Sequence, residues 1–214
     1  SDSSIWQSKK KLLTLYSGID KKIFYPSLIY DKKINILYRS SYVLRKGEHI
    51  LKKTLLKLSN DNEFKLKINF IIIGSTSIND FLKNYNFNYN YLGAPKNDYE
   101  LSKVYRKSDF FLNTSIQDGG PMMINEAIMS NLLVISFPTQ LASEVITKSN
   151  GFLIKNDRSK FDIIDTIKNK LGDDFLNPLN KSYSDRLLPI IQNNNLLCTY
   201  MTTGKYVYMY LTKI

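Results

Sequence analysis

Cysteine and histidine are almost absent from this chain. Its 214 residues include one cysteine, Cys198, and one histidine, His49. A single cysteine excludes an intrachain disulfide and a thiolate metal cluster, and no group of His or Asp residues has the spacing of metal ligands. We therefore expect a chain that relies on its packed core, holds no metal or other cofactor, and works in a reducing, cytoplasmic setting.

Long apolar runs are lacking as well. Stretches such as 68–73 and 132–137 are far shorter than the roughly 20 residues of a membrane-spanning helix. The opening sequence SDSSIWQSKKKLL has no apolar signal-peptide core. These features predict a soluble protein.

Negative charge is scarce relative to positive charge. The chain has 30 Lys and Arg against 19 Asp and Glu, which gives a formal net charge of +11. This excess suits a phosphorylated ligand or peripheral contact with an anionic membrane. The lysines are scattered and form no basic stripe with interleaved aromatic residues, so we expect no nucleic-acid partner.

Short apolar runs alternate with segments of helical periodicity from residue 34 onward. This rhythm is typical of an α/β fold in which helices connect the strands of a parallel sheet. It predicts a Rossmann-like, doubly wound sheet of about six strands, with the ligand site at the carboxyl ends of the strands. The expected strands are 34–38, 68–73, 89–92, 110–113, 132–136 and 152–154.

One strand-to-helix corner has the features of an anion site. Gly119 and Gly120 remove side chains beside the expected helix start, where Pro121 occupies a position that favours proline. The free N–H groups and the dipole of such a helix attract a diphosphate. Two carboxylates, Asp118 in the turn and Glu126 inside the helix, flank this corner and are suited to bind sugar hydroxyls.

The segment QDGGPMMINEAIMSN that contains this corner resembles the E-x7-E segment of glycosyltransferase family 4, the group 1 glycosyltransferases. Asp118 stands in the place of the first glutamate, and Glu126 keeps the second. The resemblance is to the carboxyl-terminal, donor-binding half of a GT-B type enzyme and covers roughly residues 17–160. Other segments follow in the family's order: SGIDKKIFYP, RKGEHIL, FIIIGS, YLGAPKNDYELSKVYRKSDFFLNTS and SEVITKSNGFLIKND.

The resemblance implies roles for individual residues. Asp118 and Glu126 would be the catalytic pair, with Glu126 on the donor ribose and Asp118 against the transferred sugar. The backbone N–H groups of Met122 and Met123 would bind the diphosphate, and Lys46 matches the family's phosphate-binding lysine.

One position departs from the family pattern. Ser41 stands where the family usually has an arginine, five residues before the lysine. Either Arg39 or Arg45 would supply the missing charge, or the donor would bind more weakly; we include Arg39 in the expected site. Gly74, after a strand, would allow the backbone to approach the nucleotide, or is an ordinary turn glycine.

The resemblance implies a retaining hexosyltransferase that moves a sugar from a UDP- or GDP-sugar to a hydroxyl acceptor, as in polysaccharide assembly. It also implies the domain organisation. Residues 1–27 would be the end of an absent acceptor domain and its linker, 28–172 the Rossmann-like domain, and 173–214 a helical tail that packs back toward the first domain. The tyrosines of KYVYMYL alternate with period two, which favours a strand, whereas the length of this segment also allows a helix.

Two alternatives belong to other functional classes. A non-catalytic nucleotide-sugar-binding or regulatory subunit of a split glycosyltransferase would keep the donor site and take its acceptor domain from a partner subunit. A nicotinamide dehydrogenase is disfavoured, because no G-x-G-x-x-G follows the first expected strand.

Overall fold

The computed structural model describes residues 18–26, 33–118, 122–154, 196–203 and 206–213. Its strands are β1 (Ile34–Ser40), β2 (Ile68–Gly74), β3 (Tyr89–Gly93), β4 (Phe110–Asn113), β5 (Leu133–Ser136), β6 (Gly151–Leu153), β7 (Leu196–Thr203) and β8 (Tyr206–Lys213). Its helices are the short 3-10 turn η2 (Leu44–Lys46), α1 (Glu48–Leu58), α2 (Asn62–Lys67), α3 (Asn79–Asn84), α4 (Asp98–Tyr105), α5 (Met122–Met129) and α6 (Gln140–Val145).

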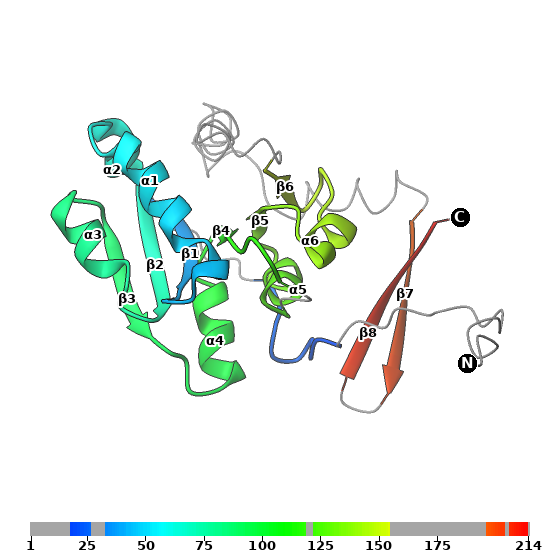
Figure 1. Cartoon of the computed structure of the whole chain (residues 1–214). Helices are drawn as coiled ribbons and strands as arrows, with labels where there is room; N and C mark the ends of the chain where they lie inside the picture. Colours follow the sequence, from blue (N-terminus) through cyan, green and yellow to red (C-terminus); the bar gives the residue numbers. More distant parts are fainter. Residues whose placement is uncertain (1–17, 27–32, 119–121, 155–195, 204–205, 214) are drawn as a thin grey trace, which may run out of the picture.

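Six of the strands form one sheet in the order β3-β2-β1-β4-β5-β6, and every neighbouring pair in it is parallel (Figure 1). The predicted α/β sheet is therefore confirmed, and each predicted strand lies within two residues of an observed one. The strand order reverses between β1 and β4. In a doubly wound fold the ligand site lies at such a point, outside the carboxyl ends of the strands.

Helices cover both faces of the sheet because successive strand residues point to opposite sides. On β1, Ile36 and Tyr38 pack with α1, α2 and α3 in one core. Leu37 between them packs with α4, α5 and α6 in the other. Such strands are apolar on both faces, which is why they were readable as continuous hydrophobic runs.

The segment 18–26 belongs to the second of these cores. Ile19, Ile23 and Phe24 are buried there. The carbonyl oxygen of Ile23 accepts a hydrogen bond from Arg106 Nη1 at 3.3 Å. The described part of the predicted linker is thus packed against the domain, while the boundary after residue 27 stays a prediction.

The predicted helical tail is wrong for residues 196–203 and 206–213. These residues form β7 and β8, an antiparallel pair with Leu196 opposite Lys213 and Thr203 opposite Tyr206. The period-two alternation of tyrosines was the correct indication, since aromatic and β-branched residues favour extended backbone. Residues 155–195 lie outside the described ranges, and so does any helix predicted there.

Candidate functional site

The carboxyl ends of β1 and β4 bring two distant parts of the sequence together. Lys46, at the end of η2, forms an ion pair through its Nζ with Asp118 Oδ2 in the loop after β4. Their side chains are 30% and 13% exposed, respectively. The residue predicted to bind phosphate and the residue predicted to bind the transferred sugar are therefore in direct contact. We call Lys46, Asp118, Glu126 and the first turn of α5 the switch-point site.

Backbone geometry holds this contact in place. Thr114 Oγ1 donates a hydrogen bond to Lys46 O at 2.8 Å, and Ile116 N donates to Arg45 O at 2.8 Å. Gly47 adopts φ +72°, and a Cβ there would lie 1.9 Å from Thr114 O. Only glycine allows the turn before α1 to approach the end of β4 so closely.

Glu126, the residue predicted to bind the ribose, is buried in α5, where 8% of its surface is exposed. Its Oε2 accepts a hydrogen bond of 2.8 Å from the Tyr105 hydroxyl. Burial raises the pKa of Glu126 above its ordinary value, as does the nearby Asp98 carboxylate, whereas Tyr105 and Arg39 act in the opposite direction. Carboxylates with perturbed pKa values cluster at functional sites, so Glu126 is a candidate site residue.

The structure distinguishes the two arginines that were candidates for the missing charge. Arg39 alternates with Tyr38 and Ser40 on β1 and so lies on the α5 side of the sheet, where its Nη1 donates to Met123 Sδ at 3.5 Å. Arg45 instead donates to Gln117 O at 3.3 Å and braces the loop before Asp118. Arg39 is the arginine that faces the first turn of α5.

The remaining predicted residues fall into two groups. Helix α5 begins at Met122, so the N–H groups of Met122 and Met123 belong to its first turn and have no carbonyl partner within the helix. Gly74 has φ +90° and packs against β1, where an added Cβ would lie 2.6 Å from Ser40 O. The residues Gly119, Gly120 and Pro121 lie outside the described ranges.

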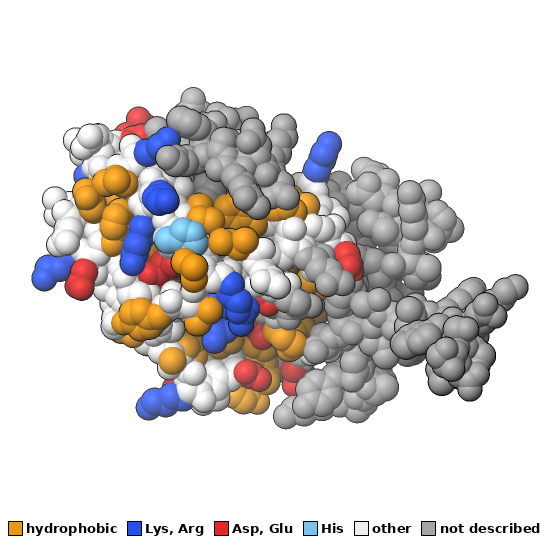
Figure 2. Space-filling view, viewed as in Figure 1, with side chains coloured by type: hydrophobic (Ala, Val, Ile, Leu, Met, Phe, Trp, Pro, Cys, Tyr) orange, Lys and Arg blue, Asp and Glu red, His pale blue; other side chains and the backbone are white. Residues whose placement is uncertain are grey.

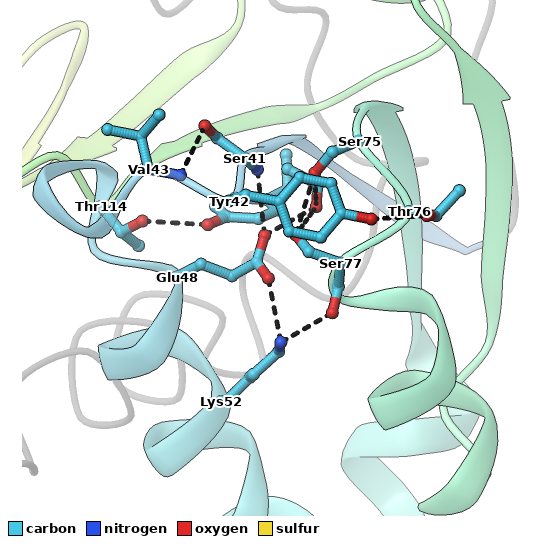
Figure 3. Close-up of polar contacts among 11 residues, drawn as sticks. Ser41, Tyr42, Val43, Glu48, Lys52, Ser75, Thr76, Ser77 and Thr114 are labelled. Carbon is cyan, nitrogen blue, oxygen red and sulfur yellow. Dashed lines mark hydrogen bonds and ion pairs between the residues drawn. The ribbon is translucent and has the colours of Figure 1, made fainter.

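Sequence reasoning missed Glu48, a buried carboxylate at the start of α1 (Figure 3). Its Oε2 accepts hydrogen bonds from Ser40 Oγ at 2.6 Å and Ser41 N at 3.1 Å, and its Oε1 lies 3.0 Å from Lys52 Nζ. Burial raises the pKa of Glu48, but the hydrogen bonds and the lysine together lower it below its ordinary value.

The Glu48 cluster joins the ends of β1 and β2. Ser40 Oγ lies within 3.1 Å of Ser75 Oγ and 2.9 Å of Ser77 Oγ, and Lys52 Nζ donates to Ser77 O at 2.7 Å. Ser41, which replaces the family arginine, is thus bound to a carboxylate through its backbone. The sequence showed Glu48 only as an acidic residue in the first turn of a helix, and acidic residues are common at that position.

Two further observations concern metals and membranes. Within the described ranges, no group of three or more His, Cys, Asp or Glu side chains is arranged to hold a metal ion. None of the helices in that part of the chain is long and apolar enough to span a bilayer. On the face shown in Figure 2, Lys and Arg side chains are scattered among apolar and acidic ones.

Comparison with known proteins agrees with this fold. A family model described as "Glycosyl transferases group 1" matches residues 20–185, which is more than half of the chain. No curated protein sequence matches significantly. Sucrose-phosphate synthase from Thermosynechococcus elongatus superimposes with a TM-score of 0.60 at 18% identity, over 81% of this chain and 47% of the synthase.

Two other solved structures give the same result. The C-terminal domain of LpcC, a group 1 glycosyl transferase from Francisella tularensis, has a TM-score of 0.59 at 20% identity and covers 82% of this chain and 98% of that domain. TarM from S. aureus, solved with UDP, has a TM-score of 0.63 at 20% identity, over 86% of this chain and 37% of TarM. The chain therefore spans half or less of the larger proteins and nearly all of an isolated C-terminal domain.

Proposed function

The chain belongs to the group 1 glycosyltransferases, and we propose that it binds the sugar donor, a nucleoside diphosphate sugar, for transfer to a hydroxyl acceptor with retention. The observation that carries this proposal is the convergence of Lys46, Asp118 and the first turn of α5 at the β1–β4 switch point. Cationic, anionic and backbone N–H groups meet there at the edge where such folds bind ligands.

In this proposal the donor is distributed over three parts of the site. Lys46 and the N–H groups of Met122 and Met123 bind the diphosphate, and Arg39 adds a positive charge from β1. Glu126 binds the ribose. Asp118 lies against the transferred sugar and exchanges its bond with Lys46 for bonds to the sugar when the donor enters.

The proposed chemistry depends on charge. As the bond between the anomeric carbon and the diphosphate oxygen breaks, negative charge accumulates on the leaving diphosphate. Groups already oriented toward that charge stabilise the transition state more than the ground state and so accelerate transfer. Lys46 and the start of α5 are such groups, and this chemistry calls for no resident cofactor.

An acceptor-binding part completes the proposed enzyme, either elsewhere in a longer chain or in a partner subunit. The GtfA/B complex, with 17% identity over 35% of the GtfA/B chain, is a solved two-component assembly with this fold. Closure of the two parts would exclude water from the activated sugar. The net charge of +11 suits cytoplasmic work at an anionic membrane, where polysaccharide precursors are assembled.

The second candidate is a subunit that binds the donor without catalysing transfer. The solved GtfA/B complex, which shares this fold, supports an arrangement in which such a subunit has a partner. Such a subunit would bind donor with the same residues but would neither hydrolyse nor transfer the sugar when supplied with simple acceptors. Release of UDP from UDP-glucose in the presence of the partner part distinguishes the two candidates.

Titration calorimetry of the whole chain tests donor binding. UDP, GDP, NAD and a short oligonucleotide are titrated into the wild type, Glu126→Ala and Glu63→Ala. Glu63 is a matched control, since it is an exposed carboxylate on α2 that pairs with Lys67. The proposal predicts that one nucleoside diphosphate binds and that only Glu126→Ala loses it. Binding of NAD or the oligonucleotide instead, or equal binding by all three proteins, would contradict it.

A further inference from the structure

Tyr105 is the last residue of α4 and has no exposed surface. Its hydroxyl donates to Glu126 Oε2 at 2.8 Å and lies 3.3 Å from the carbonyl oxygen of Met123. A phenol has one proton, so the shorter contact with the carboxylate is the stronger bond. Tyr105 therefore contacts Glu126 of the switch-point site from within the hydrophobic core.

The Tyr105 ring is held rigidly. Phe24 and Phe111 pack edge-on against it, with ring centroids 5.9 and 6.3 Å away. A tyrosine has two side-chain torsions, and these ring contacts together with burial restrict both of them. The hydroxyl is therefore held beside Oε2 of Glu126.

The two oxygens of Glu126 are not equivalent in this arrangement. Oε2 is occupied by Tyr105. Within the described residues, no side chain or N–H group donates a hydrogen bond to Oε1. Each carboxylate oxygen can accept about two hydrogen bonds, so Oε1 keeps more capacity for a ligand than Oε2 does.

We propose that Tyr105 is a positioning residue that fixes Glu126 so that Oε1 is presented to the ribose hydroxyls of the donor. This inference rests on the proposed function and deepens it, because it assigns discrimination between ribose and a sugar without the two ribose hydroxyls to a tyrosine that the ligand does not touch. A carboxylate held in one orientation loses no conformational entropy when it binds a hydroxyl.

The charges around the pair are compatible with this role. Burial raises the pKa of the Tyr105 phenol well above its ordinary value, and the Glu126 charge raises it further, so the phenol stays a donor. Arg39 and Asp98 are the other charged groups that act on Glu126, and their effects oppose one another. The Tyr105 bond favours the ionised form of Glu126, which is the better acceptor for a hydroxyl.

The test compares UDP with 2′,3′-dideoxy-UDP, which lacks both ribose hydroxyls, by calorimetry; GDP and its dideoxy form replace them if GDP is the nucleotide that binds. The wild type should prefer UDP by about 10- to 100-fold, the range for one hydrogen bond to a charged group. Tyr105→Phe keeps the ring and removes the hydroxyl, and it should lose most of this preference.

Tyr38→Phe is the matched control, since Tyr38 is also buried in the sheet core and its hydroxyl bonds to Thr114 Oγ1 at 3.2 Å. It should leave the preference for UDP unchanged, whatever it does to stability. Equal preference for UDP in wild type and Tyr105→Phe would overturn the inference but not the proposed function. Absence of nucleotide binding by the wild type would overturn both.

The pKa of Glu126 can be measured without nucleotide and tests the inference independently of donor binding. Carbon-13 NMR of the labelled Glu126 carboxyl should show a higher pKa in Tyr105→Phe, because the bond that favours the ionised form is gone. If Tyr105→Phe does not fold, the wild type should show a slowly exchanging Tyr105 hydroxyl proton that persists when UDP is bound. An unchanged pKa, or loss of that proton on binding, would contradict the inference.

Discussion

Lys46 Nζ and Asp118 Oδ2 form an ion pair that connects the turn after β1 with the loop after β4. Under the proposed function, these two groups bind different parts of the donor. The diphosphate must therefore take Lys46 from Asp118, and the ion pair is a competitor of the ligand.

Substitutions at the two ends of this pair should have opposite effects on UDP affinity. Lys46→Ala removes a charged donor and should weaken binding by about 10- to 100-fold. Asp118→Asn leaves Lys46 without its competitor and should strengthen UDP binding by about two- to fivefold. Calorimetry at low and high salt measures both. The interpretation would be wrong if both variants weakened UDP binding equally.

Alanine substitutions at Gly47 and Gly93 test whether the turn after β1 must lie close to the end of β4. Both have φ +72°, but a Cβ at Gly93 would meet no atom within 4 Å, whereas one at Gly47 would meet Thr114 O. Gly93→Ala should cost about 1–2 kcal/mol of unfolding free energy, the strain of a left-handed alanine. Gly47→Ala should cost clearly more and also weaken UDP binding.

Urea denaturation gives both unfolding free energies. Equal losses for the two glycine variants would show that the turn has room to relax away from Thr114. Gly93→Ala serves as the control for binding as well, since it introduces the same backbone strain outside the switch-point site.

The contribution of Glu48 to the stability of the fold should be lost in acid. Its pKa is lowered in the folded chain, so its contribution is present above its ordinary pKa and is lost as pH falls through the folded value. Glu48→Gln should therefore be less stable than wild type at neutral pH, and the difference should shrink as pH falls. Thermal unfolding across pH measures this, with the exposed Glu63→Gln as a control that should change little.

Glu126 should behave in the opposite way. Its pKa is raised in the folded chain, so its stabilising contribution is complete below its ordinary pKa and is lost as pH rises through the folded value. Glu126→Gln should thus be more stable than wild type at neutral pH, with the advantage vanishing in acid, while UDP affinity falls. A variant that lost stability and affinity together would indicate a structural carboxylate.

The central strands were predictable from the sequence because parallel strands that are buried on both faces are continuous apolar runs. Phe110–Asn113 was predicted to the residue. The anion site after β4 was equally local, since glycines, a proline and two carboxylates stand within one short segment. The tail was ambiguous for the opposite reason, because its tyrosine alternation and its length pointed to different structures.

Other features were decided only by the tertiary structure. The sequence offered Arg39 and Arg45 as sources of the missing charge, with Arg39 in the expected site. Strand alternation on β1 directs Arg39 toward α5, whereas Arg45 in η2 bonds to Gln117 O. In the sequence, Tyr105 occupies an ordinary apolar position of a helix. Only the packing of α4 beside α5 brings its hydroxyl to Glu126. Local sequence determines which backbone forms, but strand order and packing determine which side chains meet, and contacts of that kind leave no local pattern.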